Sequence, residues 1–524
     1  MLQEIESPPL TANHEDSHLP QRILRPGDTC WRIARADRFA VIVDAADYFA
    51  HAKEAMLKAK HSILLVGWDF DLRIRLTPDD DGEDGRIRLG DFLKELVNRK
   101  PGLRIYILKW DMAVFFTMRW EIVPMILHDI VGTRRIHLRF DSTHPLMAAH
   151  HQKIVVIDDA LAFCGGIDMT EHRWDTREHI PNDRHRIDPA GENYGPCHDS
   201  TTAVDGEAAR ALGELARMRW QFATGQNLPV PDRTLDVWPE ALQPQLHDVD
   251  VGIARTFPAY GRRDAVSEIE KLYVAAIRAA RDTIYIENQF LASKRIVEAL
   301  CARLQEDDGP EVLFITPQSA ESWLEEEVMD SARALCLQRL LRADRHGRFG
   351  IYYPVNAAEQ SIYVHSKVMV VDDRLLRVGS SNVNNRSMGF DSECDLAVEG
   401  TPEEPRTQST VLNLRNNFLA EHLDVSQAAV AQAILEHGSL LRAVEALRKN
   451  EGRSLRPLPL REVSEAEELI VETRLADPER PAQPERRIEH MAKRAVLRHP
   501  ITAAALLGGA ALTGALIASR LFRR

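Results

Sequence analysis

The sequence predicts an α/β fold built from two similar halves, each with a mixed sheet. Two observations support this prediction. Short apolar runs that fit buried strands alternate with longer segments of helical periodicity, and this alternation begins twice along the 524-residue chain. Hydrophobic residues make up 44% of the chain and charged residues 28%, which is ordinary for a globular protein and excludes a largely disordered one.

In the first half, Asp44 can cap a helix that runs to residue 60, because apolar residues then recur three and four positions apart. The apolar run 62–68 is too short for such a helix and predicts a buried strand. The same criteria predict a helix at 89–99 and strands at 103–110, 135–140 and 153–157.

The second half repeats the pattern after a proline-rich join with no clear periodicity. Helices are expected at 265–280 and 321–343, and strands at 283–286, 312–315, 349–353 and 368–371. Two further helices are expected at 408–422 and 426–448. The resulting division is a leader (1–35), a first half (36–225), a connection (226–254), a second half (255–424), a helical extension (425–452), a linker (453–500) and a terminal segment (501–519).

The terminal segment 501–519 contains no charged residue and, as a helix, would be about 28 Å long, close to the thickness of a hydrocarbon core. It predicts a single transmembrane tail, with a buried or interfacial helix as the alternative. The basic residues around this segment suit an anionic membrane face, because residues 485–524 carry eight basic and two acidic residues, a net charge of +6. Since the whole chain has a net charge of −13, residues 1–484 carry −19.

The location of the protein is predicted from the same features. The acidic, polar N-terminus has no apolar signal-peptide core, and the six cysteines show no C-x-x-C spacing, so reduced thiols are expected. We therefore expect a cytoplasmic body anchored by its C-terminal segment to a membrane, the inner membrane if the source is bacterial. The acidic body also argues against a nucleic-acid partner.

One short segment occurs in both halves. His151-Gln152-Lys153 is followed by four apolar residues and Asp158, and His365-Ser366-Lys367 is followed by four apolar residues and Asp372. After each aspartate, six residues intervene before a small pair, and two positions after that pair comes a polar residue: Gly165-Gly166 with Asp168, and Gly379-Ser380 with Asn382. The halves agree in spacing over eighteen residues, so chance is an inadequate explanation.

The residue types explain what such a repeat can do. A histidine and a lysine two positions apart in a strand project to the same face. Two such strand ends that face each other would place two imidazoles and two ammonium groups around one phosphodiester. The lysines neutralise its oxygens, one imidazole attacks phosphorus, and the other protonates the leaving alcohol. This chemistry needs no metal or other cofactor.

The paired segments resemble the HKD motifs of the phospholipase D superfamily. Five further segments resemble the true phospholipases D rather than the short nucleases: 165–168, 174–179, 196–199, 286–290 and 379–388. The resemblance extends from about residue 36 to about residue 422. It implies two α/β halves related by a pseudo-two-fold axis, with the active site at their junction. Cys197 departs from the family, which often has a tryptophan there.

The resemblance also implies roles for individual residues. His151 resembles the nucleophile and His365 the general acid and base, although the near symmetry of the motifs leaves their order open. The other residues expected at the site are Lys153, Lys367, Ser380, Asn382, Gly166 and Asp168 around the phosphoryl group, Asp199 and Glu393 as carboxylates that orient the histidines, and the motif aspartates Asp158 and Asp372. The acid-rich run 171–179 matches no zinc spacing and is expected to be a loop held by salt bridges.

The function that follows is phospholipase D activity on glycerophospholipids, with phosphatidic acid and a head-group alcohol as products. The expected partners are a phospholipid, a membrane, and water or an alcohol as acceptor. Three alternatives stay open: a phosphatidyltransferase of the cardiolipin synthase type, a nuclease, and a non-catalytic membrane scaffold.

Overall fold

The computed structural model of the chain describes residues 22–80, 82, 85, 87–111, 133–232, 235–320, 329–474 and 477–481. Its strands form one continuous mixed sheet that runs through both halves, with a separate pair β7–β14. The strands are β1 Arg32–Val43, β2 Ser62–Gly67, β3 Arg104–Trp110, β4 Ile136–Asp141, β5 Ile154–Ile157, β6 Leu161–Gly165, β7 Cys197–His198, β8 Ser200–Asp205, β9 Leu246–Phe257, β10 Val266–Ser267, β11 Thr283–Asn288, β12 Glu311–Ile315, β13 Phe349–Val355, β14 Tyr363–Val364, β15 Lys367–Val371, β16 Leu375–Gly379, β17 Glu393–Glu399 and β18 Ser454–Pro457.

The strand order has a symmetry that the sequence repeat leads one to expect. From one edge to the centre the order is β4-β3-β2-β5-β6-β8-β1, and from the other side of the sheet it is β13-β12-β11-β15-β16-β17-β9. In each half three parallel strands are followed by antiparallel neighbours. The long strands β1 and β9 pair antiparallel at the centre and join the halves. Strands β5 and β15, which follow the two histidine–lysine segments, therefore occupy equivalent positions.

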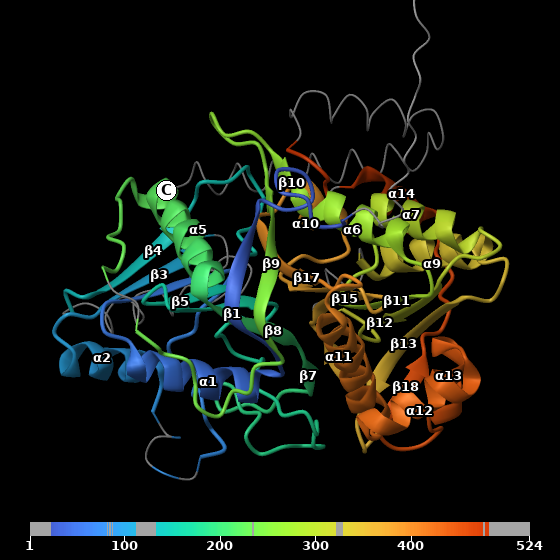
Figure 1. The fold of residues 1–524 in the computed structure, drawn as a ribbon, viewed down its shortest axis with the longest axis horizontal. Coiled ribbons are helices and arrows are strands. Elements are labelled where there is room, and N and C mark those ends of the chain that lie inside the picture. Colours follow the sequence, from blue (N-terminus) through green and yellow to red (C-terminus); the bar gives the residue numbers. More distant parts are fainter. Residues whose placement is uncertain are drawn as a thin grey trace, which may run out of the picture.

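Helices cover both faces of the sheet (Figure 1). In the first half α1 and α2 lie on one side and α5 on the other, whereas in the second half α6, α7 and α9 lie opposite α11, α12 and α13. These helices are α1 Ala45–Lys58, α2 Leu89–Arg99, α5 Gly206–Thr224, α6 Glu268–Ala279, α7 Lys294–Leu304, α9 Ser331–Ala343, α10 Asn385–Gly389, α11 Pro405–Leu423, α12 Gln427–His437, α13 Leu440–Leu447 and α14 Glu465–Thr473.

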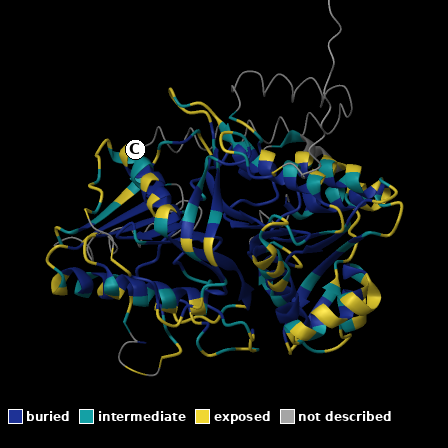
Figure 2. Ribbon diagram, in the orientation of Figure 1, coloured by how far each residue is buried: buried dark blue, intermediate teal, exposed yellow. Residues whose placement is uncertain are grey.

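The core explains why the strands form as apolar runs. Strands β2, β5 and β15 are buried along their whole length, as expected where helices cover both faces. One hydrophobic cluster extends through both halves beneath α5 and α11, a second lies under α1 and α2, and a third under α6, α7 and α9. Exposed residues are confined mainly to the outer faces of helices and to loops (Figure 2).

Several expected boundaries differ from the structure because tertiary pairing overrides local composition. The expected linker begins with β18, which pairs with β13, and the expected connection already contains the start of β9. In the expected leader, the amides of Ile23 and Leu24 bind the carboxylate of Glu399. The expected helix 426–448 is two helices, because Gly438 adopts a left-handed conformation and Ser439 caps the next helix.

The prediction of a transmembrane tail is corrected. Among the residues that the structure describes, no helix has both the length and the apolar character that a membrane span requires. The segment 501–519, on which the prediction of a single transmembrane tail and of membrane anchoring rested, lies outside the described residues. The described fold is the mixed α/β sheet and its covering helices, and the anchored location has no support from it.

Candidate active site

The two histidine–lysine segments enter their strands through matching contacts with the opposite half. The amide of His151 donates to the carbonyl of Ser392 at 2.9 Å, and the amide of His365 donates to the carbonyl of His198 at 2.8 Å. Residue 150 forms a parallel bridge with residue 392, and β14, just before His365, pairs with β7. Each segment is thus held beside the strand that carries the other half's carboxylate.

The side chain of each of these histidines contacts a carboxylate from the other half of the molecule. Nδ1 of His151 lies 3.0 Å from Oε2 of Glu393, 242 residues away in the sequence. Nδ1 of His365 lies 2.6 Å from Oδ2 of Asp199, 166 residues away. In both imidazoles Nδ1 is therefore occupied, and Nε2 is the atom left to face a substrate. Such a carboxylate contact fixes both the orientation and the tautomer of an imidazole.

The carboxylates are themselves held in place. Glu393 accepts hydrogen bonds from the hydroxyls of Ser380 and Ser387. Asp199 accepts from the amide of Ser200 at 2.7 Å. Gly166 makes room for it, because a Cβ at this position would lie 2.1 Å from Oδ1 of Asp199. The glycine that the repeat singled out therefore has a steric role next to the His365–Asp199 pair.

Two buried lysines complete the site. Nζ of Lys153 lies 3.0 Å from Oδ2 of Asp168, and Nζ of Lys367 lies 3.4 Å from Oε1 of Gln289. One oxygen of Asp168 and the side-chain oxygen of Asn382 are buried with no hydrogen-bond partner among the described residues. A buried polar atom without a partner is costly, so these two atoms mark where a bound group could contribute hydrogen bonds.

Burial shifts the pKa of both members of the His151–Glu393 pair. It lowers the pKa of His151 well below its ordinary value, as do the ammonium groups of Lys153 and Lys367. It raises the pKa of Glu393 well above the ordinary value. Both directions have the same cause, because a low-dielectric site penalises each charged form. The pair therefore favours a neutral imidazole, and the tautomer in which Nδ1 donates to Glu393 has its Nε2 lone pair available for attack.

The His365–Asp199 pair behaves similarly. Burial lowers the pKa of His365 well below its ordinary value, with Lys367 and Arg173 adding to the effect. Burial also raises the pKa of Asp199 to about 7 and lowers the pKa of Lys367 to about 7. Two groups that contribute to this site consequently change charge close to neutral pH.

The motif aspartates lie away from this centre. Asp158 accepts from three backbone amides, those of residues 60, 61 and 62, at 2.6–2.8 Å. Asp372 does the same for residues 281, 282 and 283 at 2.8–2.9 Å. Both lie at the far end of the strand that starts near the histidine, and both anchor the turn that leads into a neighbouring strand.

Sequence reasoning missed a buried ionic network behind Asp199. Asp44, expected as a helix cap, makes no cap bond and instead accepts from the amide of Asp199 at 3.0 Å. His198 contacts Glu421 at 2.8 Å and Glu287 at 3.0 Å. Burial opposes protonation of His198, but Glu287, Asp44 and Glu421 together raise its pKa well above the ordinary value. The only sequence signal was the position of His198 beside Asp199.

Three groups of described residues have donors close enough to hold a metal ion. The first consists of Asp44, His179, His198 and Glu421, the second of His198, Glu287 and His422, and the third of Glu171, His172 and Asp188. In the first group the imidazoles already bind the carboxylates, with His179 3.3 Å from Glu421. The network is thus balanced by protonated histidines, as the pKa of His179, raised to about 9 by its carboxylate neighbours despite burial, indicates.

Comparisons with known proteins agree with this geometry. A family model described as "Cardiolipin synthase, PLD-like domain" matches residues 273–418. The chain is 24% identical to phospholipase D A of Dictyostelium discoideum, over 70% of this chain and 33% of that protein. It is 25% identical to phospholipase D alpha 1 of Cynara cardunculus, over 66% of this chain and 59% of that protein. The chain thus spans a third to three fifths of the length of these relatives.

Matches among solved structures are more distant. A phosphatidylserine synthase of Haemophilus influenzae matches 72% of this chain and 86% of that chain, with a TM-score of 0.47 and 12% identity. The phospholipase D family member Nuc of Salmonella typhimurium matches 32% of this chain and 93% of that chain, with a TM-score of 0.23 and 15% identity. On the family model and the curated relatives, which agree with the paired motifs, the chain belongs to the phospholipase D superfamily.

Proposed function

We propose that the protein is a phospholipase D that hydrolyses the distal phosphodiester of glycerophospholipids to phosphatidic acid and a head-group alcohol. The observation that carries this proposal is the crossed pair of histidine–carboxylate contacts, His151–Glu393 and His365–Asp199, flanked by two buried lysines. The curated relatives, which are named phospholipases D, support the same activity.

The steps follow from the free Nε2 atoms. Nε2 of His151 attacks phosphorus, a P–N bond forms, and the P–O bond to the head group breaks as Nε2 of His365 donates to the leaving oxygen the proton that the His365–Asp199 pair holds. His365 then takes a proton from water, whose oxygen attacks phosphorus and breaks the P–N bond. Phosphatidic acid leaves and both histidines return to their starting state. Lys153 and Lys367 stabilise the charge on the non-bridging oxygens throughout.

The surface beside His151 supports a lipid substrate. Leu146 and Met147 lie five and four residues before it, with 84% and 47% of their area exposed. The loop is held in this form, since Arg386 donates to the carbonyl of Met147 at 2.7 Å and Met147 adopts a left-handed φ of 69°. Apolar side chains fixed in an exposed position next to a phosphodiester site suit an aggregated lipid better than a soluble ester.

A phosphatidyltransferase of the cardiolipin synthase type is the second candidate, supported by the family model over the second half. It would use the same intermediate with the hydroxyl of another lipid in place of water. The two candidates differ only in the acceptor of the phosphatidyl group.

The experiment that tests the proposal is incubation with phosphatidylcholine, phosphatidylethanolamine or phosphatidylglycerol, each labelled in its head group, with and without a primary alcohol. We expect head-group release and, with alcohol, a phosphatidylalcohol, both lost in His151→Ala and His365→Ala. His437→Ala, an exposed histidine at the end of α12, is the control. Cardiolipin as the main product from phosphatidylglycerol would favour the transferase, and DNA cleavage without lipid turnover would contradict both.

A further inference from the structure

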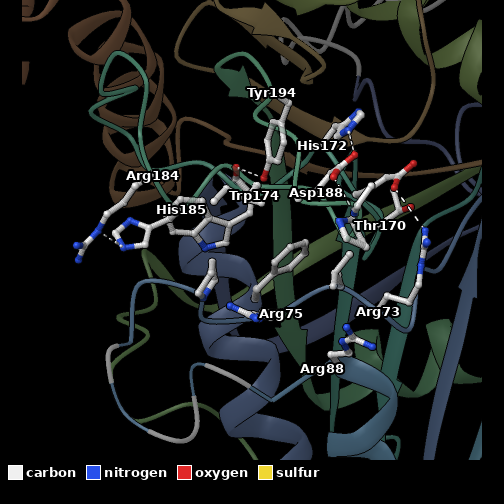
Figure 3. Close-up of a pocket in the computed structure, with 18 residues that line it drawn as sticks. Arg73, Arg75, Arg88, Thr170, His172, Trp174, Arg184, His185, Asp188 and Tyr194 are labelled. Atoms are coloured by element: carbon white, nitrogen blue, oxygen red, sulfur yellow. Dashed lines mark hydrogen bonds and ion pairs between the residues drawn. The ribbon is translucent and has the colours of Figure 1, made fainter.

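A second pocket lies outside the catalytic residues, on the first half of the molecule. Its volume is about 430 Å³, and its walls come from the segment 73–78, from Arg88 at the start of α2, and from the loop 170–194 (Figure 3). The catalytic steps described above use none of the side chains that line it. The pocket combines arginines, aromatic rings and two acidic residues, so its charge balance decides what it can bind.

The acidic groups of the pocket are already paired. Arg73 contacts Asp71 at 2.5 Å and Glu171 at 3.6 Å. Asp188 lies 3.5 Å from His172 and accepts the amides of residues 190 and 192 at 2.8 and 2.9 Å. These carboxylates therefore have their own cation or amide donors and are not needed to balance further positive charge.

Two arginines remain without such a partner. Arg75 and Arg88 face each other across an isolated antiparallel bridge, and both are exposed. Within the described ranges, no carboxylate forms an ion pair with either guanidinium. Like charges opposite each other on paired strands repel, so this placement costs stability unless an anion lies between or beside them. Figure 3 shows both side chains on the same side of the pocket, below Thr170 and Trp174 in that view.

An unused donor lies in the same wall. The Trp174 side chain lines the pocket and is only 4% exposed, and its indole N–H has no hydrogen-bond acceptor among the described residues. A buried donor of this kind is normally satisfied in a folded protein. Together with the two guanidinium groups it supplies hydrogen-bond donors to the wall of the pocket.

We infer that this pocket is an anion site that binds a phosphate group through Arg75 and Arg88, separate from the phosphodiester site at His151 and His365. A guanidinium group binds two oxygens of a phosphate with two parallel hydrogen bonds, and a phosphate has enough oxygens for both guanidinium groups, which a chloride does not. The ligand is a phosphate ester, either a soluble molecule or the head group of an anionic lipid.

The site is placed so that its occupancy can reach the catalytic centre. Thr170 and Trp174 line the pocket, whereas Asp168, two residues before Thr170, pairs with Lys153. Arg173, between the pocket residues His172 and Trp174, is close enough to His365 for its charge to act on that imidazole. One short loop therefore connects the anion site with both histidine–lysine segments.

The test is local amide hydrogen exchange, measured on the whole protein with inorganic phosphate, with glycerol 3-phosphate, and with phosphatidylcholine vesicles with or without phosphatidic acid. We expect slower exchange in 73–78 and 170–191, separable from any change in 151–153 and 365–367. In the double variant Arg75→Gln/Arg88→Gln the apparent Kd for that protection should rise about ten-fold or more. Head-group release from a short-chain soluble phospholipid should stay unchanged.

Arg210→Gln, an exposed arginine on α5 outside the pocket, should behave as the wild type. Protection by glycerol 3-phosphate assigns a soluble ligand, and protection only by phosphatidic acid vesicles assigns a lipid head group. Both results support the site. Equal protection in the double variant and the wild type, or no protection of these segments by any probe, would overturn it. Failure of lipid turnover in the wild type would contradict the proposed function but not this site.

Discussion

At the scale of single residues, the site depends on glycines, which have no side chain. Gly166 allows the carboxylate of Asp199 to approach the backbone, and Gly379, which corresponds to Gly165 in the repeat, does the same for Asp395, whose Oδ1 would lie 1.9 Å from an added Cβ. A small-residue pair in each repeat is therefore a steric requirement of the carboxylate beside it.

Substitution of Gly166 tests that requirement. Gly166→Ala should displace Asp199 and, through it, His365, and a misplacement of about 1 Å in a catalytic group costs about 100-fold in rate. Head-group release should fall accordingly while the circular dichroism spectrum is unchanged. Gly195→Ala, where a Cβ meets nothing within 4 Å, should retain full activity. Equal activities of the two variants would show that Asp199 does not position His365.

At the scale of elements, the strands that carry the site are anchored at both ends. The histidine end of β5 and β15 contacts the opposite half, and the aspartate end ties down the turn before β2 or β11. Asp158 and Asp372 both have a left-handed φ, of 52° and 51°, which lets one carboxylate reach three amides. We assign these aspartates to the rigidity of the strand rather than to the reaction.

This assignment predicts a separation of stability from chemistry. Asp158→Ala leaves three backbone amides without their acceptor and should lower the free energy of unfolding by about 2–4 kcal/mol. At a temperature where the variant is folded, kcat should stay within about three-fold of the wild type, since a distant anchor adds no transition-state contact. Urea denaturation and initial rates measure the two quantities. Asp307→Ala, at a fully exposed position, is the control. A large loss of kcat with an unchanged free energy of unfolding would show that Asp158 takes part in the reaction.

At the scale of the whole molecule, the active site belongs to neither half alone. Each histidine is oriented by a carboxylate from the other half, so that the charges at the centre respond to one shared environment. That environment is buried, and it moves the pKa of Asp199 up and the pKa of Lys367 down, both to about 7. An ammonium that loses its charge near neutrality limits activity on the alkaline side.

The pH profile follows from these signs. Above a pH of about 7 Lys367 loses the charge that binds the phosphoryl oxygens. We therefore expect kcat/KM to fall on the alkaline side of neutrality. In Lys367→Arg the side chain stays charged, so the alkaline limb should move to higher pH, whereas Lys60→Arg on the surface should not move it. An alkaline limb that is the same in all three proteins would exclude Lys367 as its origin.

Much of this organisation could be predicted from the sequence. Periodicity identified strands β2, β12 and β15 and helix α2 almost to the residue, because their apolar patterns are local. The repeat singled out both histidine–lysine segments and the small pairs that follow them. Only three-dimensional pairing could show that β18, in a segment with the composition of a linker, completes the sheet. The network around His198 was equally hidden, because its carboxylates come from α11 and β11.

The sequence by itself identified the side chains that we propose act on a phosphodiester, since one histidine and one lysine occur twice at the same spacing. Only the tertiary structure decided how they are used. The crossing of His151 to Glu393 and of His365 to Asp199 spans 242 and 166 residues, and no local pattern encodes a contact at such a separation. It exists because β1 and β9 bring the two halves together edge to edge, and burial at that junction then sets the charges.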